Sequence, residues 1–290
     1  MTSTDNVALA VETAGPPDTP TVLCIHGYPD NRSVWDAVAT DLVTAGLRVV
    51  RYDVRGAGDS DAPAGRAAYR LDQLTDDLLT VLDAVNPQCP VHVVGHDWGA
   101  IQTWHALGSG RLAGRALSFT SISGPSLDHA TRWMRSQLRL DHEARRRVLR
   151  QVVKSTYLVL FVPPGLPEFL WRTRIMDRLL SGRLRLPERS AAGQRRLSDK
   201  INGLQLYRAN IARRRRPALQ QTTIPVQVLA PIRDRYVSVE LQTEAPAPWV
   251  AELRTEVFDD GHWIIVRHPH LVADRIAALI REVERRRDVS

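Results

Sequence analysis

The chain has 290 residues, of which 43% are hydrophobic and 24% are charged, and its formal net charge is +7 at pH 7. This length and composition allow a large buried core, which excludes a disordered tail, a collagen-like chain and a small disulfide scaffold. The sequence contains no apolar run of about 18 residues, and its first residues lack the basic and apolar regions of a secretory signal. We therefore expect a cytoplasmic protein without a transmembrane segment.

The basic residues are almost all arginines, and they form clusters at 145–147, 213–216 and 285–287. An anionic partner, such as a nucleic acid or a lipid headgroup, could bind such clusters. Because no nucleic-acid motif accompanies them, we interpret them as solvated surface and expect no nucleic-acid partner. Neither Cys24 nor Cys89 has a metal-type spacing to a histidine, so no metal site is predicted. Cys24 lies in an apolar run and is predicted to be buried.

Short apolar runs alternate with amphipathic stretches over the first 120 residues and again near the end of the chain. The predicted strands cover 21–26, 47–53, 91–96, 115–123, 224–231 and 253–259, and the predicted helices cover 33–44, 71–85, 99–107 and 270–285. This alternation predicts an α/β fold with a mostly parallel central sheet flanked by helices.

A block of about 100 residues interrupts this alternation with helical segments and prolines. Insertions at the carboxyl edge of such a sheet usually cover the ligand crevice. We therefore predict a core formed by residues 1–123 and 224–290, with residues 124–223 inserted as a helical lid.

The string with the most chemical information is GHDWG, residues 95–99, which follows a predicted strand and precedes a predicted helix. It has the spacing of a nucleophile elbow, a tight strand-to-helix turn in which the flanking glycines make room for the central residue. That residue is Asp97, not serine. A carboxylate here can attack an electrophilic sp³ carbon and form an ester. The alternative interpretation is an Asp that caps an ordinary helix.

Three further features support the elbow. The HGYPD string after the first predicted strand suits an oxyanion hole, which would use the backbone N–H groups of Tyr28 and Trp98. Asp234 and His262 follow later strands in the order nucleophile, acid, histidine, at the edge where such sheets present catalytic residues. The alternatives at this edge are Asp259 and Asp260 for the acid, and His268 and His270 for the base.

Two tyrosines in the lid, Tyr157 and Tyr207, could donate hydrogen bonds to a developing alkoxide. Each could instead be a packing residue with a satisfied hydroxyl. The lid is apolar over 157–170, which predicts a bulky hydrophobic substrate.

With these motifs, the chain resembles the α/β-hydrolase fold and, within it, the epoxide hydrolases, over nearly its whole length. The resemblance is carried by HGYPD with a tryptophan downstream, RYDVRGAGDSD, GHDWGA, the late acid and DGHW. Residues 118–129 are also similar to bacterial proteins in which an epoxide-hydrolase-like half precedes a short-chain dehydrogenase half. The departures are Tyr28, where phenylalanine is more usual, and Leu160, where many members have a second tyrosine. The resemblance implies substrate-binding roles for Trp35, Trp98, Phe161 and Trp263.

The resemblance also implies a two-step mechanism. Asp97 attacks an epoxide carbon while Tyr157 and Tyr207 hold the ring oxygen, which yields an alkyl-enzyme ester. His262, oriented by Asp234, then activates a water that hydrolyses the ester to a vicinal diol. The expected partners are a hydrophobic epoxide, as a small-molecule substrate, and water, with no cofactor and no metal. Whether the chain forms a homo-oligomer stays open.

Other α/β-hydrolases leave alternatives open. Haloalkane dehalogenases use the same two steps, but their usual halide-binding asparagine corresponds to Tyr28. Haloacetate dehalogenases often have arginine where Trp98 stands. A non-catalytic ligand-binding member of the fold is a third alternative, although it would not need the full set of Asp97, Asp234 and His262.

Overall fold

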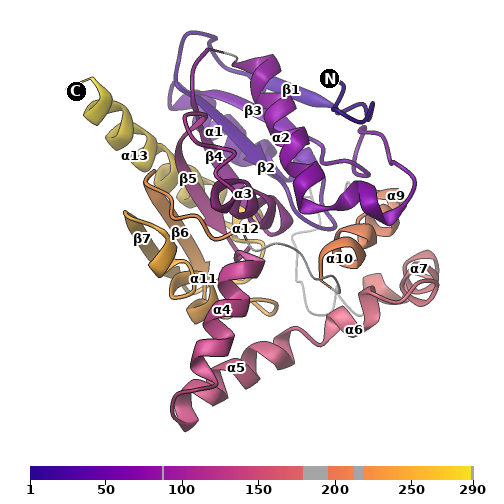
Figure 1. The fold of residues 1–290 in the computed structure, drawn as a ribbon. Helices are drawn as coiled ribbons and strands as arrows, with labels where there is room; N and C mark the ends of the chain where they lie inside the picture. Colours follow the sequence, from indigo (N-terminus) through magenta and orange to yellow (C-terminus); the bar gives the residue numbers. More distant parts are fainter. Residues whose placement is uncertain (87, 179–194, 212–217, 289–290) are drawn as a thin grey trace.

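The computed structural model describes residues 1–288 except 87, 179–194 and 212–217 (Figure 1). Its centre is a seven-stranded sheet in the order β1-β3-β2-β4-β5-β6-β7, in which β1 pairs antiparallel with β3 and the other neighbours pair in parallel. The strands are β1 (Val11–Ala14), β2 (Thr21–Ile25), β3 (Arg48–Tyr52), β4 (Val91–His96), β5 (Ala116–Ile122), β6 (Val226–Pro231) and β7 (Leu253–Phe258). The predicted mostly parallel α/β fold is confirmed, and the short edge strand β1 is the strand that the sequence did not reveal.

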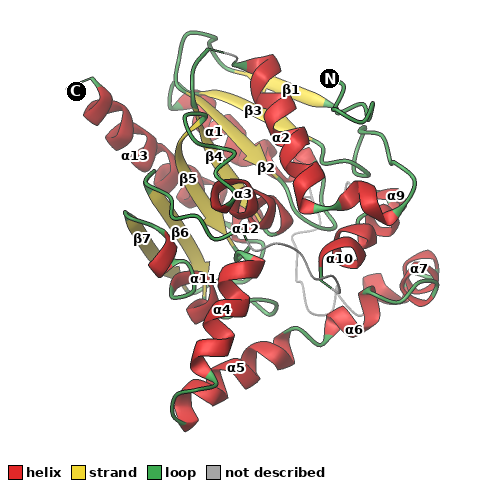
Figure 2. Ribbon diagram, viewed as in Figure 1, coloured by secondary structure: helices red, strands yellow, loops and turns green. Residues whose placement is uncertain are grey.

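Helices cover both faces of the sheet (Figure 2). The helices of the core are α1 (Asp36–Thr44), α2 (Leu71–Val85), α3 (Trp98–Gly108), α11 (Val239–Thr243), α12 (Ile264–Arg267) and α13 (Pro269–Arg287). Short 3₁₀ turns cover Arg32–Trp35, Arg66–Tyr69 and Ala247–Trp249. The helix predicted over 33–44 therefore begins as a 3₁₀ turn and continues as α1.

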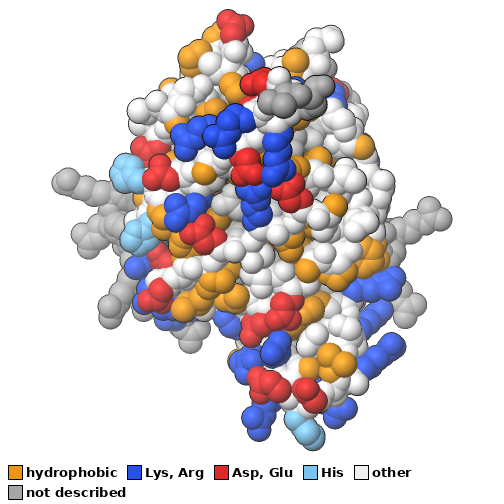
Figure 3. All heavy atoms as spheres, turned by 90° about the vertical axis from the view of Figure 1, so that its left-hand side faces the viewer, with side chains coloured by type: hydrophobic (Ala, Val, Ile, Leu, Met, Phe, Trp, Pro, Cys, Tyr) orange, Lys and Arg blue, Asp and Glu red, His pale blue; other side chains and the backbone are white. Residues whose placement is uncertain are grey.

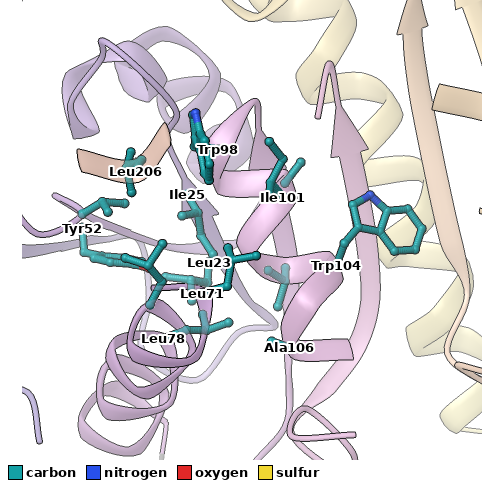
Figure 4. Packing of buried hydrophobic residues seen from close by; sticks show 14 of the residues in the cluster. Leu23, Ile25, Tyr52, Leu71, Leu78, Trp98, Ile101, Trp104, Ala106 and Leu206 are labelled. Carbon is teal, nitrogen blue, oxygen red and sulfur yellow. The ribbon is translucent and has the colours of Figure 1, made fainter. Parts of the chain in front are cut away.

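Two apolar clusters fill the space between the sheet and its helices. Along β2 successive side chains point to opposite faces, so Val22 and Cys24 join the cluster under α1 and α13. Leu23 and Ile25 join the larger cluster under α2 and α3, part of which is shown in Figure 4. The strand is buried on both faces, which explains its unbroken apolar run.

The described residues between β5 and β6 form helices next to the carboxyl ends of the strands (Figure 1). They are α4 (Leu127–Gln137), α5 (His142–Lys154), α6 (Tyr157–Phe161), α7 (Leu166–Arg172), α9 (Leu197–Asn202) and α10 (Leu204–Asn210). We call residues 124–223 the lid. Residues 179–194 and 212–217, and with them the arginine cluster at 213–216, lie outside the described residues.

Two of the C-terminal arginines lie in ion pairs on the surface of the protein. Arg286 and Arg287 of the C-terminal cluster pair with glutamates, as expected for solvated surface. Over the described ranges, no helix is long and apolar enough to cross a membrane. The same residues contain no group of three or more histidine, cysteine or acidic side chains placed to hold a metal ion.

Candidate active site

Asp97 lies at the tip of β4, where the chain turns sharply into α3. Its φ of +50° is rare for a residue with a side chain, and the close packing around the turn holds it there. A Cβ on Gly95 would lie 2.6 Å from the backbone nitrogen of Ala100, so a larger residue would force the strand and helix apart. The structure therefore places the Asp97 side chain as the nucleophile-elbow spacing predicts.

The loop after β2 approaches the same carboxylate. The backbone N–H of Tyr28 donates to Asp97 Oδ2 at 2.8 Å, and the N–H of Trp98 also donates to this carboxylate. A Cβ on Gly27 would lie 2.5 Å from the Cβ of Asp97, so glycine allows the approach. The two N–H groups thus converge on the position where a tetrahedral oxyanion on this carboxyl group would form.

His262 and Asp234 complete the group. His262 Nδ1 lies 2.9 Å from Asp234 Oδ2, and His262 Nε2 lies 3.9 Å from Asp97 Oδ1. The backbone N–H groups of Tyr236 and Val237 donate to Asp234 Oδ1 at 2.8 and 3.1 Å, which fixes the carboxylate. A carboxylate held in this way orients the imidazole with its second nitrogen toward Asp97.

The alternative acids and bases lie elsewhere. His268 pairs with Asp260 at 2.9 Å, and His270 is exposed and pairs with Asp41 at 2.7 Å. Asp259 is exposed and pairs with Arg233. None of these histidines reaches Asp97 among the described ion pairs, so the geometry favours His262 as the base.

The ionisation of the three groups suits proton transfer. Burial raises the pKa of Asp97 to about 6, against the opposing effects of His262 and the Tyr28 and Trp98 N–H groups. Burial alone would lower the pKa of His262, but the charge of Asp234 and its hydrogen bond raise it overall. Burial likewise opposes ionisation of Asp234, yet His262 and two backbone donors hold its pKa below the ordinary value.

The two lid tyrosines, Tyr157 and Tyr207, lie beside each other in the cavity that Asp97 also lines. Tyr157 begins α6 and Tyr207 lies in α10, and their ring centroids are 6.0 Å apart. Burial, and after it nearby charges including that of Asp97, raises the pKa of each hydroxyl above the ordinary value. Both phenols therefore stay protonated at neutral pH and can donate hydrogen bonds.

A small cavity joins these groups. Its lining side chains are Tyr28, Pro29, Asp97, Tyr157, Phe161, Tyr207, Tyr236, His262 and Trp263. Phe161 and Trp263 thus lie where the resemblance places them. The ring of Trp98 is not part of this lining; it is buried and packs edge-on against Tyr207 with centroids 5.0 Å apart. The Trp98 ring packs against Tyr207 outside the cavity, while the Trp98 backbone N–H donates to Asp97.

Trp35 does not belong to this site, and its expected substrate-binding role is wrong. The side chain is fully buried and packs in the cluster under α1 and α13, together with Val22, Val38 and Ile265. It does not line the cavity. The turn that begins at Arg32 directs this tryptophan under the sheet, because an aromatic ring at this point fills the space between α1 and β2.

Tyr236 is a site residue that the sequence analysis missed. Its ring packs edge-on against His262 and Tyr157, with centroids 4.9 and 5.2 Å apart. Burial and the charge of Asp234 raise the pKa of its hydroxyl to about 12. Its position two residues after the acid, in the loop that closes over the histidine, is the signal that could have pointed to it.

A family model described as the alpha/beta hydrolase fold matches residues 20–269. The chain belongs to the α/β-hydrolase fold family. Among the curated relatives of this α/β-hydrolase is "Probable oxidoreductase EphD" of Mycobacterium tuberculosis, 33% identical over 281 residues, which cover 93% of this chain and 47% of the relative. "Epoxide hydrolase A" of the same organism is 33% identical over 208 residues, which cover 70% of this chain and 60% of that protein. The chain therefore spans about half to three fifths of the length of these relatives.

Solved structures show the same fold. An epoxide hydrolase from Bacillus megaterium superposes on this α/β-hydrolase with a TM-score of 0.76 at 20% identity, over 96% of this chain and 98% of that chain. "Epoxide Hydrolase A" from Mycobacterium thermoresistibile gives a TM-score of 0.70 at 24% identity, over 96% of each chain. The motifs indicated a resemblance to epoxide hydrolases, and these similar sequences and structures confirm that resemblance.

In this α/β-hydrolase, hydrogen bonds through Asp30 connect Trp263, which lines the cavity, with Arg195 of the lid. Trp263 Nε1 donates to Asp30 Oδ2 at 2.9 Å, and Arg195 Nε donates to Asp30 Oδ1 at 2.6 Å. The Arg195 guanidinium also lies 4.9 Å from the Trp263 ring centroid. A carboxylate of the lid, Asp199, accepts hydrogen bonds from the core residues Asn31 and Gly58 at 3.1 and 3.0 Å. These contacts fix one side of the lid against the loop that carries Tyr28.

Proposed function

We propose that this α/β-hydrolase is an epoxide hydrolase that converts a hydrophobic epoxide to a vicinal diol through an ester on Asp97. The observation that carries the proposal is the sharing of one cavity by a carboxylate nucleophile and two protonated tyrosines. A carboxylate attacks carbon without a base, and the phenols supply neutral donors for an oxygen that stays attached to the product. Two of the similar proteins, that of Mycobacterium tuberculosis called "Epoxide hydrolase A" and that of Bacillus megaterium, are named epoxide hydrolases.

In the first step, an Asp97 oxygen forms a bond to one epoxide carbon while the bond from that carbon to the ring oxygen breaks. The developing alkoxide accepts a proton or a strong hydrogen bond from Tyr157 or Tyr207. Their raised pKa values keep both hydroxyls protonated before the reaction. Two donors on one oxygen lower the barrier by concentrating positive dipoles where the charge develops.

In the second step, water attacks the carboxyl carbon of the Asp97 ester. His262 Nε2 takes a proton from that water, and Asp234 stabilises the imidazolium through the 2.9 Å contact at Nδ1. The Tyr28 and Trp98 N–H groups stabilise the oxyanion. Collapse of the tetrahedral intermediate breaks the ester bond, and His262 returns its proton to the leaving alkoxide. The second proton of the water stays on the Asp97 carboxyl group and passes to the tyrosine that protonated the ring oxygen, which regenerates both groups and releases the diol.

The size of the cavity bears on how substrate enters. Its volume is about 30 Å³, enough for one water molecule but not for an epoxide with substituents. The wall on the lid side consists of Tyr157, Phe161 and Tyr207, so substrate entry requires α6 to move away from the core. The aromatic lining favours a hydrophobic substituent on the epoxide.

The reaction class is tested with a small panel of aryl- and alkyl-substituted epoxides and haloalkanes of the same size. We expect diol formation from the epoxides and no steady halide release from the haloalkanes. Halide release at a rate comparable with diol formation would favour a dehalogenase that uses the same aspartate. Turnover of neither class by folded protein would favour a non-catalytic ligand-binding protein.

A further inference from the structure

The outer surface of the lid carries an unusual number of exposed apolar side chains. In the part of the chain that the structure describes, nine of the 13 large apolar side chains that are exposed fall between residues 138 and 175. They include Leu149, Val152 and Val153 on α5, Val159 on α6, and Leu166 and Phe169 on α7. We name these six residues the apolar lid surface. Exposed apolar residues that are grouped, as Leu149, Val152 and Val153 are within α5, mark contacts with a partner or a membrane more often than isolated ones do.

Helix α5 shows how this surface is formed. Ala144, Val148 and Gln151 face the body of the protein and are buried. Leu149 and Val153 lie four residues apart on the opposite side of the helix and are 61% and 60% exposed. The helix therefore has an apolar strip that faces away from its own core.

Arginines flank this strip. Arg145 and Arg146 are exposed on α5, and Arg172 and Arg174 are exposed at the end of α7. Among the described residues, none of these four forms an ion pair with an acidic side chain, in contrast to the paired arginines of α13. Figure 3 shows the lower lobe, which α4 and α5 form, projecting from the body with both basic and acidic side chains on it.

This combination selects one kind of occupant. A helix with an apolar strip and arginines beside it inserts the strip into the acyl boundary of a bilayer, while the guanidinium groups bind lipid phosphates. A symmetric dimer through the same surface would bring the arginines of one copy against those of the other, which opposes association. A nucleic acid would bind the arginines but would offer no apolar surface to the leucine and valines.

We propose that the apolar lid surface docks on an anionic lipid membrane, with Leu149, Val153 and Val159 entering the interface and Arg145 and Arg146 contacting headgroup phosphates. Val159, which is 78% exposed, lies two residues after Tyr157 on α6, so the docked surface and the cavity wall belong to the same short helix. The opposite side of α5 holds the triad loop, since Gln151 donates to the Tyr236 carbonyl and Lys154 to the Asp234 carbonyl. A lipid surface would thus contact α6, the helix that must move to admit a hydrophobic substrate.

Vesicle co-sedimentation of the full chain tests the proposal without any substrate, so its result is separate from the test of epoxide hydration. We expect binding to mixed phosphatidylcholine–phosphatidylglycerol vesicles, weaker binding to pure phosphatidylcholine, and a loss of binding as salt is raised. The double variant Leu149→Gln/Val153→Gln keeps helix-forming residues and should lower the partition coefficient about tenfold or more.

A matched control uses the same substitution elsewhere. Val257 on β7 is 51% exposed, and Val257→Gln should bind vesicles as the unchanged chain does, whereas Val153→Gln should bind measurably less. Absence of binding to anionic vesicles overturns the proposal. Salt-sensitive binding that is equal in Val153→Gln and Val257→Gln also overturns it, because only the arginines would then be involved. Self-association of the unchanged chain that the double variant abolishes would assign the surface to a second copy.

Discussion

The carboxyl edge of the sheet, which we call the core edge, and the lid position their site residues by different physical means. Asp97, Asp234 and His262 each follow the end of a parallel strand, and the backbone fixes them through a tight elbow, two N–H donors and one short side-chain contact. Tyr157 and Tyr207 come instead from helices of five and seven residues. The positions of these three residues are therefore determined by the sheet, whereas the positions of the tyrosines are determined by how the lid packs.

The two lid helices also differ from each other. In α10, Asn210 accepts from the Leu71 N–H at 3.0 Å and donates to the Tyr69 carbonyl at 2.9 Å, which ties the helix to the core. Helix α6 has Tyr157 on its inner side and the exposed Val159 on its outer side. We infer that Tyr207 keeps its position when substrate enters and that Tyr157 moves.

The largest effect should come from Asp97→Asn, which removes the nucleophile at the core edge. We expect single-turnover alkylation to fall about 10⁴-fold or more, since losing a nucleophile has effects of this order. Intact-protein mass spectrometry should show no added substrate mass. The control Asp83→Asn replaces an exposed carboxylate on α2 and should react normally. An adduct in Asp97→Asn would move the nucleophile to another residue.

The next effect separates the two steps. His262→Gln should still be alkylated at a rate within about tenfold of the unchanged chain, but hydrolysis of the ester should slow by about 10³-fold or more. The protein should carry one substrate mass on the peptide that contains Asp97. His270→Gln, at an exposed histidine, should turn over normally. In ¹⁸O water, a first diol that contains the heavy oxygen would indicate direct attack by water and contradict the ester.

The lid donors should matter less than the nucleophile. Tyr207→Phe should slow alkylation by about 10²–10³-fold, as for one lost oxyanion donor. Tyr157→Phe should slow it less, because α6 is less tightly held. The control Tyr52→Phe removes a buried hydroxyl that has no hydrogen-bond partner in the described part of the chain, and should leave the rate unchanged. Equal rates in all three variants would leave the lid tyrosines as packing residues.

The smallest effect is a pH dependence that distinguishes Asp97 from an ordinary carboxylate. The ionised form is the nucleophile, and burial raises its pKa to about 6, so alkylation should be lost as the pH falls through 6. Stopped-flow single turnovers should be about tenfold slower at about pH 5 than at about pH 7. Ester hydrolysis needs neutral His262 and should rise at higher pH, because the pKa of this histidine is also raised. Alkylation that stays constant down to about pH 5 would show that Asp97 titrates in the ordinary range.

Much of the core edge could be predicted from the sequence, because local rules govern it. The GHDWG spacing between an apolar strand and a helix determines an elbow, and the parallel strands then bring the residues after β6 and β7 to the same edge. The helix predicted over 71–85 has these bounds in the structure. Such features depend on turn geometry and on the side-chain periodicity of neighbouring residues, which a sequence displays directly.

The remaining features depended on contacts between distant segments, which only the tertiary structure decides. Trp35 looked like a site residue, but the turn before α1 directs it into the core under the sheet. Tyr236 is a site residue because its loop folds over His262. Asp30 is buried where Arg195 of the lid and Trp263 of the core both donate hydrogen bonds to it. Side-chain direction in loops and packing between helices follow no period along the chain, so these positions were set by contacts between segments that are distant in the sequence.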